Sequence, residues 1–241
     1  MSGIRLNPGV NRTVDAGVGG PRGEGSASAS RHPAGAPDCQ TWQVRKTTNT
    51  TNTTTNTGPG PSLRPNAEQL ALAHGTTIAD VTGPGLRVLF CGINPGLWSG
   101  ATGHHFARPG NRFWPALHRS GFTPRQFRPD EQGELLALGL GITNVVARAT
   151  AKADELTADE FREGGRALAE RVALLRPRAL AVLGIGAYRT AFGRPRTSVG
   201  RQEEPLGDVE VWVLPNPSGL NAHYTLDGIA EEFRKLRQAV E

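Results

Sequence analysis

The 241-residue chain has little cysteine, little lysine and no long apolar run. Its two cysteines, Cys39 and Cys91, can form neither a disulfide framework nor a set of thiolates for a zinc or iron–sulfur site. No apolar stretch approaches the roughly 18 residues that a membrane-spanning helix requires. We therefore expect a soluble protein of a reducing compartment, cytoplasmic, with no metal and no other cofactor.

Large apolar side chains are nearly absent from residues 1–66, which contain runs such as GSASASRHPAGAP and TTNTTTNTGPGPS. Such a segment buries too little surface to offset the entropy cost of ordering, so a disordered low-complexity tail is predicted. The tail contains seven Arg and Lys residues and three acidic residues. This excess fits a loose electrostatic tether to a polyanion, and plain solvation of a linker is the alternative.

The remainder of the chain alternates short β-rich runs with amphipathic helices, which is typical of a layered α/β protein. The expected strands are Arg87–Gly92, Gly141–Val146, Ala179–Leu183 and Val209–Leu214. A capping box at Thr157 predicts a helix that ends before Pro177, and apolar residues from Leu226 to Val240 recur every three or four positions. We predict one α/β/α sandwich domain over residues 70–241, with a four-stranded, mainly parallel central sheet.

Polar turns follow three of these strands. Asn94 lies in GINPG after the first strand, Asn144 lies near the end of the second, and Asn216 begins NPSGL after the fourth. Because parallel strands direct their carboxyl ends to one edge of a sheet, the three turns are expected to line one crevice. An Asn before Pro is also a common turn former, and that is the alternative for Asn94.

Seven sequence blocks, including GINPG, GHHF, PGNRFW, GITNVVARAT and WVLPNPSGL, occur in the order found in one family. From about Ile78 onward the chain resembles the mismatch-specific uracil and thymine DNA glycosylases, a branch of the uracil-DNA glycosylase superfamily. The resemblance implies a glycosylase that removes a pyrimidine base from DNA, and it implies double-stranded DNA with G/U or G/T mismatches as the partner.

The resemblance also implies residue roles. Asn94 matches the residue that positions the attacking water, and Phe106 matches the aromatic that stacks on the flipped base. Asn144 is expected to contact the base edge, and Ile93 is expected to offer backbone groups to the base. Together with Ile93 and Phe106, Ser99 is expected to limit the width of the pocket.

The NPSGL turn resembles the family's wedge, which comprises Asn216, Ser218, Gly219 and Leu220 here. Gly219 is expected to permit close approach to the duplex and Leu220 to fill the space of the flipped nucleotide. Core packing of Phe106, and a Leu220 tucked against the last helix, are the alternatives. Ala222 stands where some relatives have an Arg, which weakens the expected reading of the orphaned guanine.

His104 and His105 are adjacent but have no nearby Cys or carboxylate partners in the sequence, so they are expected to shape their loop or to meet phosphate. We expect a monomeric, monofunctional glycosylase that hydrolyses the glycosidic bond without strand cleavage, because no amine nucleophile is evident at the crevice. Two rivals remain: a DNA-binding protein of mismatches or abasic sites with little catalysis, and a hydrolase of free nucleosides.

Overall fold

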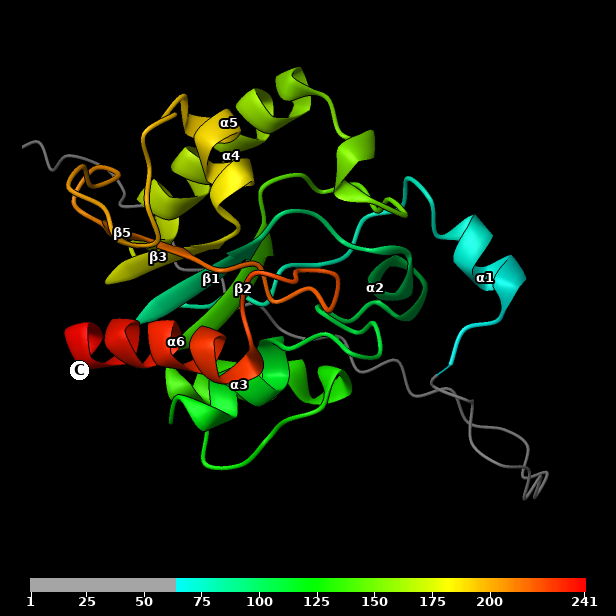
Figure 1. Cartoon of the computed structure of the whole chain (residues 1–241), viewed down its shortest axis with the longest axis horizontal. Coiled ribbons are helices and arrows are strands. Elements are labelled where there is room, and N and C mark those ends of the chain that lie inside the picture. The colour runs from blue at the N-terminus through cyan, green and yellow to red at the C-terminus, as the bar shows by residue number, and fades with distance from the viewer. Residues whose placement is uncertain (1–63) are drawn as a thin grey trace, which may run out of the picture. The chain divides into compact units, whose positions relative to one another are not determined.

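A five-stranded sheet with helices on both faces forms the centre of the computed structural model, which describes residues 64–241 (Figure 1). The strands are β1 (Val88–Gly92), β2 (Leu140–Asn144), β3 (Ala179–Leu183), β4 (Gly200–Arg201) and β5 (Glu210–Leu214). The helices are α1 (Ala67–Leu72), α2 (Leu97–Thr102), α3 (Phe113–Arg119), α4 (Ala158–Leu175), α5 (Ile185–Phe192) and α6 (Leu226–Val240), with 3₁₀ turns at Pro129–Leu138 and Ala153–Glu155. The predicted α/β sandwich is confirmed.

The strand order is β2-β1-β3-β5-β4, and the first four strands are parallel. These are the four predicted strands: β3 has the predicted bounds, and the ends of the other three differ by at most two residues. The fifth strand was not predicted. It is a two-residue edge strand that pairs antiparallel with β5 through Gly200 and Arg201, in a stretch too short and too polar to show strand periodicity.

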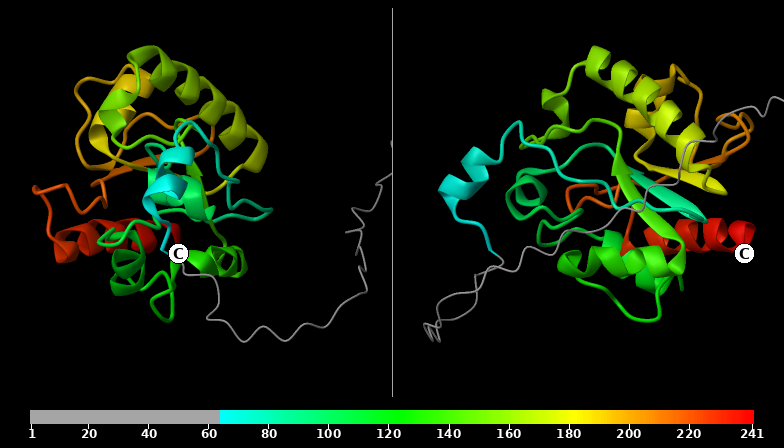
Figure 2. Two further views of the ribbon diagram at one scale, coloured as in Figure 1. Left: turned by 90° about the vertical axis from the view of Figure 1, so that its right-hand side faces the viewer. Right: turned by 180° about the vertical axis from the view of Figure 1, so that it is seen from behind.

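Alternate residues of the buried strands face opposite layers. Phe90 packs with Phe113 and Phe233, so this face of the sheet is covered by α3 and α6. Leu89 and Cys91 belong to a second core cluster that includes residues of α4 and α5. Figure 2 shows the two helical layers on opposite sides of the strands.

The capping box that predicts the start of α4 is present. Thr157 Oγ1 accepts from the backbone N–H of Glu160 at 3.2 Å, and Glu160 Oε2 accepts from the backbone N–H of Thr157 at 2.9 Å. Thr225 caps α6 in the same way by accepting from Gly228 N at 3.1 Å. These caps fix where each helix leaves its loop, and both loops contribute to the region beyond the carboxyl ends of the strands.

Residues 66–78, the N-terminal arm, carry α1 and pack against the loop that follows β2. Gly75 N donates to Ala149 O at 2.8 Å, and Ala149 N donates to Thr76 O at 2.7 Å. His74 Nε2 lies 3.0 Å from a carboxylate oxygen of Glu155. The predicted domain boundary at 70 stays a prediction, and the predicted tail lies outside the described residues except at its last three positions.

No helix within residues 64–241 is long and apolar enough to cross a lipid bilayer.

Candidate active site

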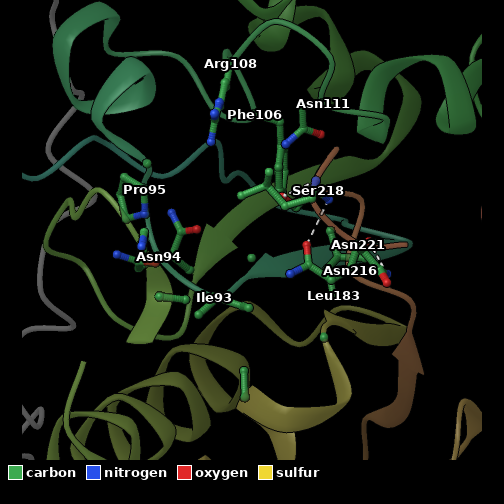
Figure 3. Close-up of a pocket in the computed structure, with 18 of the residues that line it drawn as sticks. Ile93, Asn94, Pro95, Phe106, Arg108, Asn111, Leu183, Asn216, Ser218 and Asn221 are labelled. Atoms are coloured by element: carbon green, nitrogen blue, oxygen red, sulfur yellow. Dashed lines mark hydrogen bonds between the residues drawn. The ribbon is translucent and has the colours of Figure 1, made fainter. Parts of the chain in front are cut away.

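A cavity of about 670 Å³ lies at the carboxyl ends of the parallel strands (Figure 3). It brings together residues from β1, β2 and the loop after β5, as predicted from the three polar turns. Eight of the nine predicted site residues line it: Ile93, Asn94, Ser99, Phe106, Asn144, Asn216, Ser218 and Leu220. Gly219 does not line the cavity.

The amide of Asn94 has a defined orientation. Its Nδ2 donates to Arg148 O at 3.0 Å and to Thr150 Oγ1 at 2.7 Å. Both partners lie more than 50 residues away in the sequence, so the side chain does not make the local bond of a simple turn former. Since the two acceptors take the two N–H groups of the amide, Oδ1 is left to accept a hydrogen bond from a ligand or a water.

The loop that holds Asn94 is itself tied down. Thr150 Oγ1 donates to Lys152 O at 2.8 Å, which leaves its lone pairs for the Asn94 amide. The Arg148 side chain pairs with Glu160 at 2.5 Å. Through these hydrogen bonds the pKa of Glu160 falls to about 2, with the Arg148 guanidinium as the main cause.

Phe106 forms one wall of the cavity and also lies at the edge of the core. Its ring stacks on Phe113, with centroids 4.1 Å apart and planes 23° from parallel. Phe106 is one of two non-glycine residues among those described with a positive φ, at 54°. Phe106 therefore packs against the core, as the alternative interpretation expects, and also lines the cavity. Its stacking on a flipped base stays a prediction.

Gly92 leaves room for this wall. A Cβ atom at position 92 would lie 2.5 Å from Asn144 Oδ1 and 3.3 Å from Phe106 Cζ. The first distance is too short for real atoms, so the two side chains can approach each other only over a glycine.

His105 orients Asn144. The imidazole is buried, and its Nε2 lies 3.0 Å from Ala79 O, an acceptor, so Nε2 carries the proton. Burial lowers the pKa of His105, which favours the neutral ring. Nδ1 then accepts from Asn144 Nδ2 at 3.4 Å, and the Oδ1 of Asn144 lies toward Gly92 at the cavity wall. His105 therefore shapes its loop, which is one of the two roles expected from the sequence.

Ile93 and Ser99 complete the inner wall. The carbonyl of Ile93 accepts from Val146 N at 2.9 Å, and its side chain packs close to Gly184. Ser99 is buried on α2, and its Oγ accepts a long hydrogen bond from Ala107 N at 3.4 Å. Both residues thus line the cavity while bonded to or packed against neighbouring segments of the chain.

The loop after β5 forms the outer rim. Leu220 is 72% exposed, so the alternative that it packs against the last helix is wrong. Asn216 Oδ1 accepts from Ser218 N at 3.0 Å, which closes a tight turn before Leu220. The close backbone approach at Gly219 is made within the protein, because a Cβ there would lie 2.8 Å from Gly110 O.

Two cations line the cavity. Arg108 and Lys152 are exposed, and within residues 64–241 neither side chain forms an ion pair or donates a hydrogen bond. The guanidinium of Arg108 points into the cavity between Pro95 and Phe106 (Figure 3). The expectation that no amine-bearing residue borders the crevice needs correction, because Lys152 is one of the residues that line the cavity.

Thr150 and His105 orient the amides of Asn94 and Asn144, and the sequence did not predict these roles. Thr150 and His105 lie in blocks that carry the family resemblance, but the blocks give no sign of what these side chains contact. Within residues 64–241 no cluster of three His, Cys, Asp or Glu side chains is arranged to hold a metal ion.

Comparison with known protein families agrees with this geometry. The model of the uracil DNA glycosylase superfamily matches residues 79–241, which is well over half of the chain. The match contains every residue that lines the cavity except Ile78. Members of this superfamily are glycosylase hydrolases that act on DNA. The chain belongs to the uracil DNA glycosylase superfamily.

Proposed function

We propose that the protein hydrolyses the N-glycosidic bond of uracil mispaired with guanine in duplex DNA, releasing the free base and leaving an abasic site for base excision repair. Thymine and other damaged pyrimidines are further candidate substrates. The observation that carries the proposal is the fixed amide of Asn94, whose free Oδ1 lies in the same cavity as Phe106 and Asn144.

Asn94 would hold the attacking water. As the bond between C1′ and the base breaks, positive charge develops on the sugar and the electron pair leaves with the base. The water oxygen then bonds to C1′ and its proton passes to solvent, while the base departs as an anion that solvent can protonate. Because an amide oxygen can accept a hydrogen bond but cannot take that proton as a carboxylate can, Asn94 orients the water without deprotonating it. Slow turnover is expected.

Phe106 and Asn144 would bind the flipped base. The free face of Phe106 suits stacking on a pyrimidine ring, and Asn144 offers Oδ1 as an acceptor and one remaining N–H as a donor. Uracil and thymine present a donor at N3 and an acceptor at O4, whereas cytosine presents an acceptor and a donor there. Asn144 therefore favours the first two bases.

Leu220 would insert into the duplex. Its side chain is exposed at the rim of the cavity that would receive the flipped nucleotide. Apolar insertion is a common way to offset the few kcal/mol that unstacking costs. A hydrolase of free nucleosides would have no use for an exposed leucine at this place.

Arg108 and Lys152 support a polyanionic substrate. Their charges are not neutralised by acidic side chains of the described protein, and both border the cavity. The phosphates on either side of a flipped nucleotide are suitable partners for such cations.

One assay separates the proposal from its rivals. The protein is incubated with a G·U duplex, an A·U duplex, the uracil-containing single strand and free deoxyuridine, and abasic sites are then cleaved with alkali. Base release that is fastest from the G·U duplex supports the proposal. Tight binding without release supports a DNA-binding protein, and release from deoxyuridine supports a nucleoside hydrolase.

The same assay without alkali tests monofunctional hydrolysis. Lys152 makes this test necessary, because an amine can form an imine with the aldehyde of an abasic site and promote strand cleavage. We expect no strand cleavage before alkali. Cleavage that is lost in Lys152→Gln would instead assign a lyase step to this side chain.

A further inference from the structure

One side chain, Arg112, holds the loop that carries Leu220. Its Nη1 donates to Tyr224 O at 2.5 Å, and its Nη2 donates to Asn221 O at 2.9 Å and to Ser218 O. Its Nε makes a longer contact of 3.4 Å with Pro217 O. The three guanidinium nitrogens thus reach four carbonyl groups within residues 217–224, on both sides of Leu220.

The backbone makes the same connection. Arg112 N donates to Pro217 O at 2.9 Å, and Gly219 lies against the carbonyl of Gly110. Within residues 64–241 no carboxylate forms an ion pair with Arg112, so loop carbonyls surround its charge. A planar guanidinium with five N–H donors can satisfy several carbonyl groups at once, whereas an ammonium group cannot reach them in this arrangement.

Arg112 also stands next to the base-stacking wall. It directly precedes Phe113, the first residue of α3, on which the ring of Phe106 stacks. One residue therefore joins the wall that would hold the flipped base to the loop that would fill the gap left in the duplex.

We infer that Arg112 is a positioning residue that presents Leu220 to duplex DNA and couples its insertion to capture of the base. The inference rests on the proposed function. A loop that is ordered before binding loses less conformational entropy when it inserts, so the benefit of Arg112 is confined to substrates that require insertion.

The test is a double-mutant cycle with Leu220→Ala. Arg112→Met keeps the length of the side chain and removes all its donors, and Arg112→Lys keeps the charge. Single-turnover base release is measured on the G·U duplex and on the uracil-containing single strand. We expect Arg112→Met to slow base release from the duplex by about tenfold or more and to change the rate on the single strand little. The rate of Arg112→Lys on the duplex should lie between those of Arg112→Met and the wild type.

In the Leu220→Ala background, Arg112→Met should cost almost nothing further on the duplex, because residues that act together are not additive. Arg119→Met is the matched control, since Arg119 lies at the other end of α3 and its guanidinium pairs with Asp227 at 2.5 Å instead of with the carbonyl groups of residues 217–224. This variant should retain wild-type rates on both substrates.

Equal losses of Arg112→Met on duplex and single strand, or additive losses with Leu220→Ala, would overturn the inference. The single-strand rate and the melting temperature show whether a variant is folded, and Arg112→Lys provides a second variant if Arg112→Met is not. If the wild-type protein releases no base at all, the proposed function fails separately. In that case the double-mutant cycle measures dissociation constants for the G·U duplex and the single strand. Equal losses of affinity on both, or additive losses with Leu220→Ala, would again overturn the inference.

Discussion

The amide nitrogen of Asn94 lies 2.7 Å from Thr150 Oγ1, and this contact fixes which end of the amide faces the cavity. A flipped amide would present an N–H to the water and would place Oδ1 against the carbonyl of Arg148. Thr150 and Arg148 therefore both hold the amide in the orientation in which Oδ1 can accept a hydrogen bond from a water, which the proposed mechanism requires.

Replacing Thr150 by Val keeps the shape of the side chain and removes its hydroxyl. We expect single-turnover base release to fall by about tenfold, the scale of one lost hydrogen bond, while substrate binding changes little. Thr150→Ser restores the hydroxyl and should recover most of the rate. Wild-type release from Thr150→Val would show that Arg148 O alone orients the amide.

Replacing Asn94 by Ala removes the proposed water acceptor. The rate of base release should fall by about 10²-fold or more, which is typical of losing a positioned catalytic group. Binding to the G·U duplex should persist, because the stacking wall and the wedge are untouched. Unchanged release from Asn94→Ala would contradict the proposed mechanism.

Gly92→Ala tests the wall formed by Phe106 and Asn144. The added Cβ would lie 2.5 Å from Asn144 Oδ1, so the amide and the ring must shift. We expect about 10²-fold slower release, the cost of a misplacement of about 1 Å, with a modest change in melting temperature. Gly96→Ala is the matched control from the turn that follows β1, because a Cβ there meets no atom within 4 Å. If both variants slow base release equally, the arrangement of Phe106 and Asn144 over Gly92 does not determine the rate.

The pair of Arg148 and Glu160 predicts a dependence of stability on pH. The pKa of Glu160 is lowered from 4.5 to about 2 in the folded protein, mainly by Arg148. A lowered carboxyl pKa contributes stability above the unfolded value, and this contribution is lost as the pH falls from about 4.5 toward 2.

Glu160→Gln is the variant that tests this, because it removes the charge and keeps an acceptor for Thr157 N. Thermal unfolding of both proteins is followed between pH 7 and pH 2. The variant should melt at a lower temperature than the wild type above pH 5, and the difference should shrink below pH 4.5. A difference that is constant over this range would mean that the ion pair does not stabilise the fold.

The parallel sheet could be predicted from the sequence because its four main strands are short, apolar and separated by amphipathic helices. Their order in the polypeptide then places Asn94, Asn144 and Asn216 at one edge of the sheet. Strand β4 could not be predicted, since a two-residue edge strand leaves no periodic pattern.

The contacts that orient Asn94 and the loop of Leu220 could not be predicted from the sequence, for a different reason. The partners of Asn94 are a backbone carbonyl and a hydroxyl more than 50 residues away, and Arg112 acts on carbonyls more than 100 residues away. Backbone carbonyls occur at every residue, so a side chain that binds them leaves no second residue type to search for. Lys152 could not be predicted either, because only the folded structure shows that it borders the cavity.

The contacts of the N-terminal arm limit where the chain can be shortened. The superfamily match begins at residue 79, yet Gly75 and Thr76 exchange hydrogen bonds with Ala149, which lies between the two residues that hold the Asn94 amide. A chain trimmed to residues 79–241 would keep the matched region and lose the backbone hydrogen bonds that the arm makes to Ala149. The N-terminal boundary of a shortened chain therefore belongs before the arm, at or before residue 66, and not at the start of the family match.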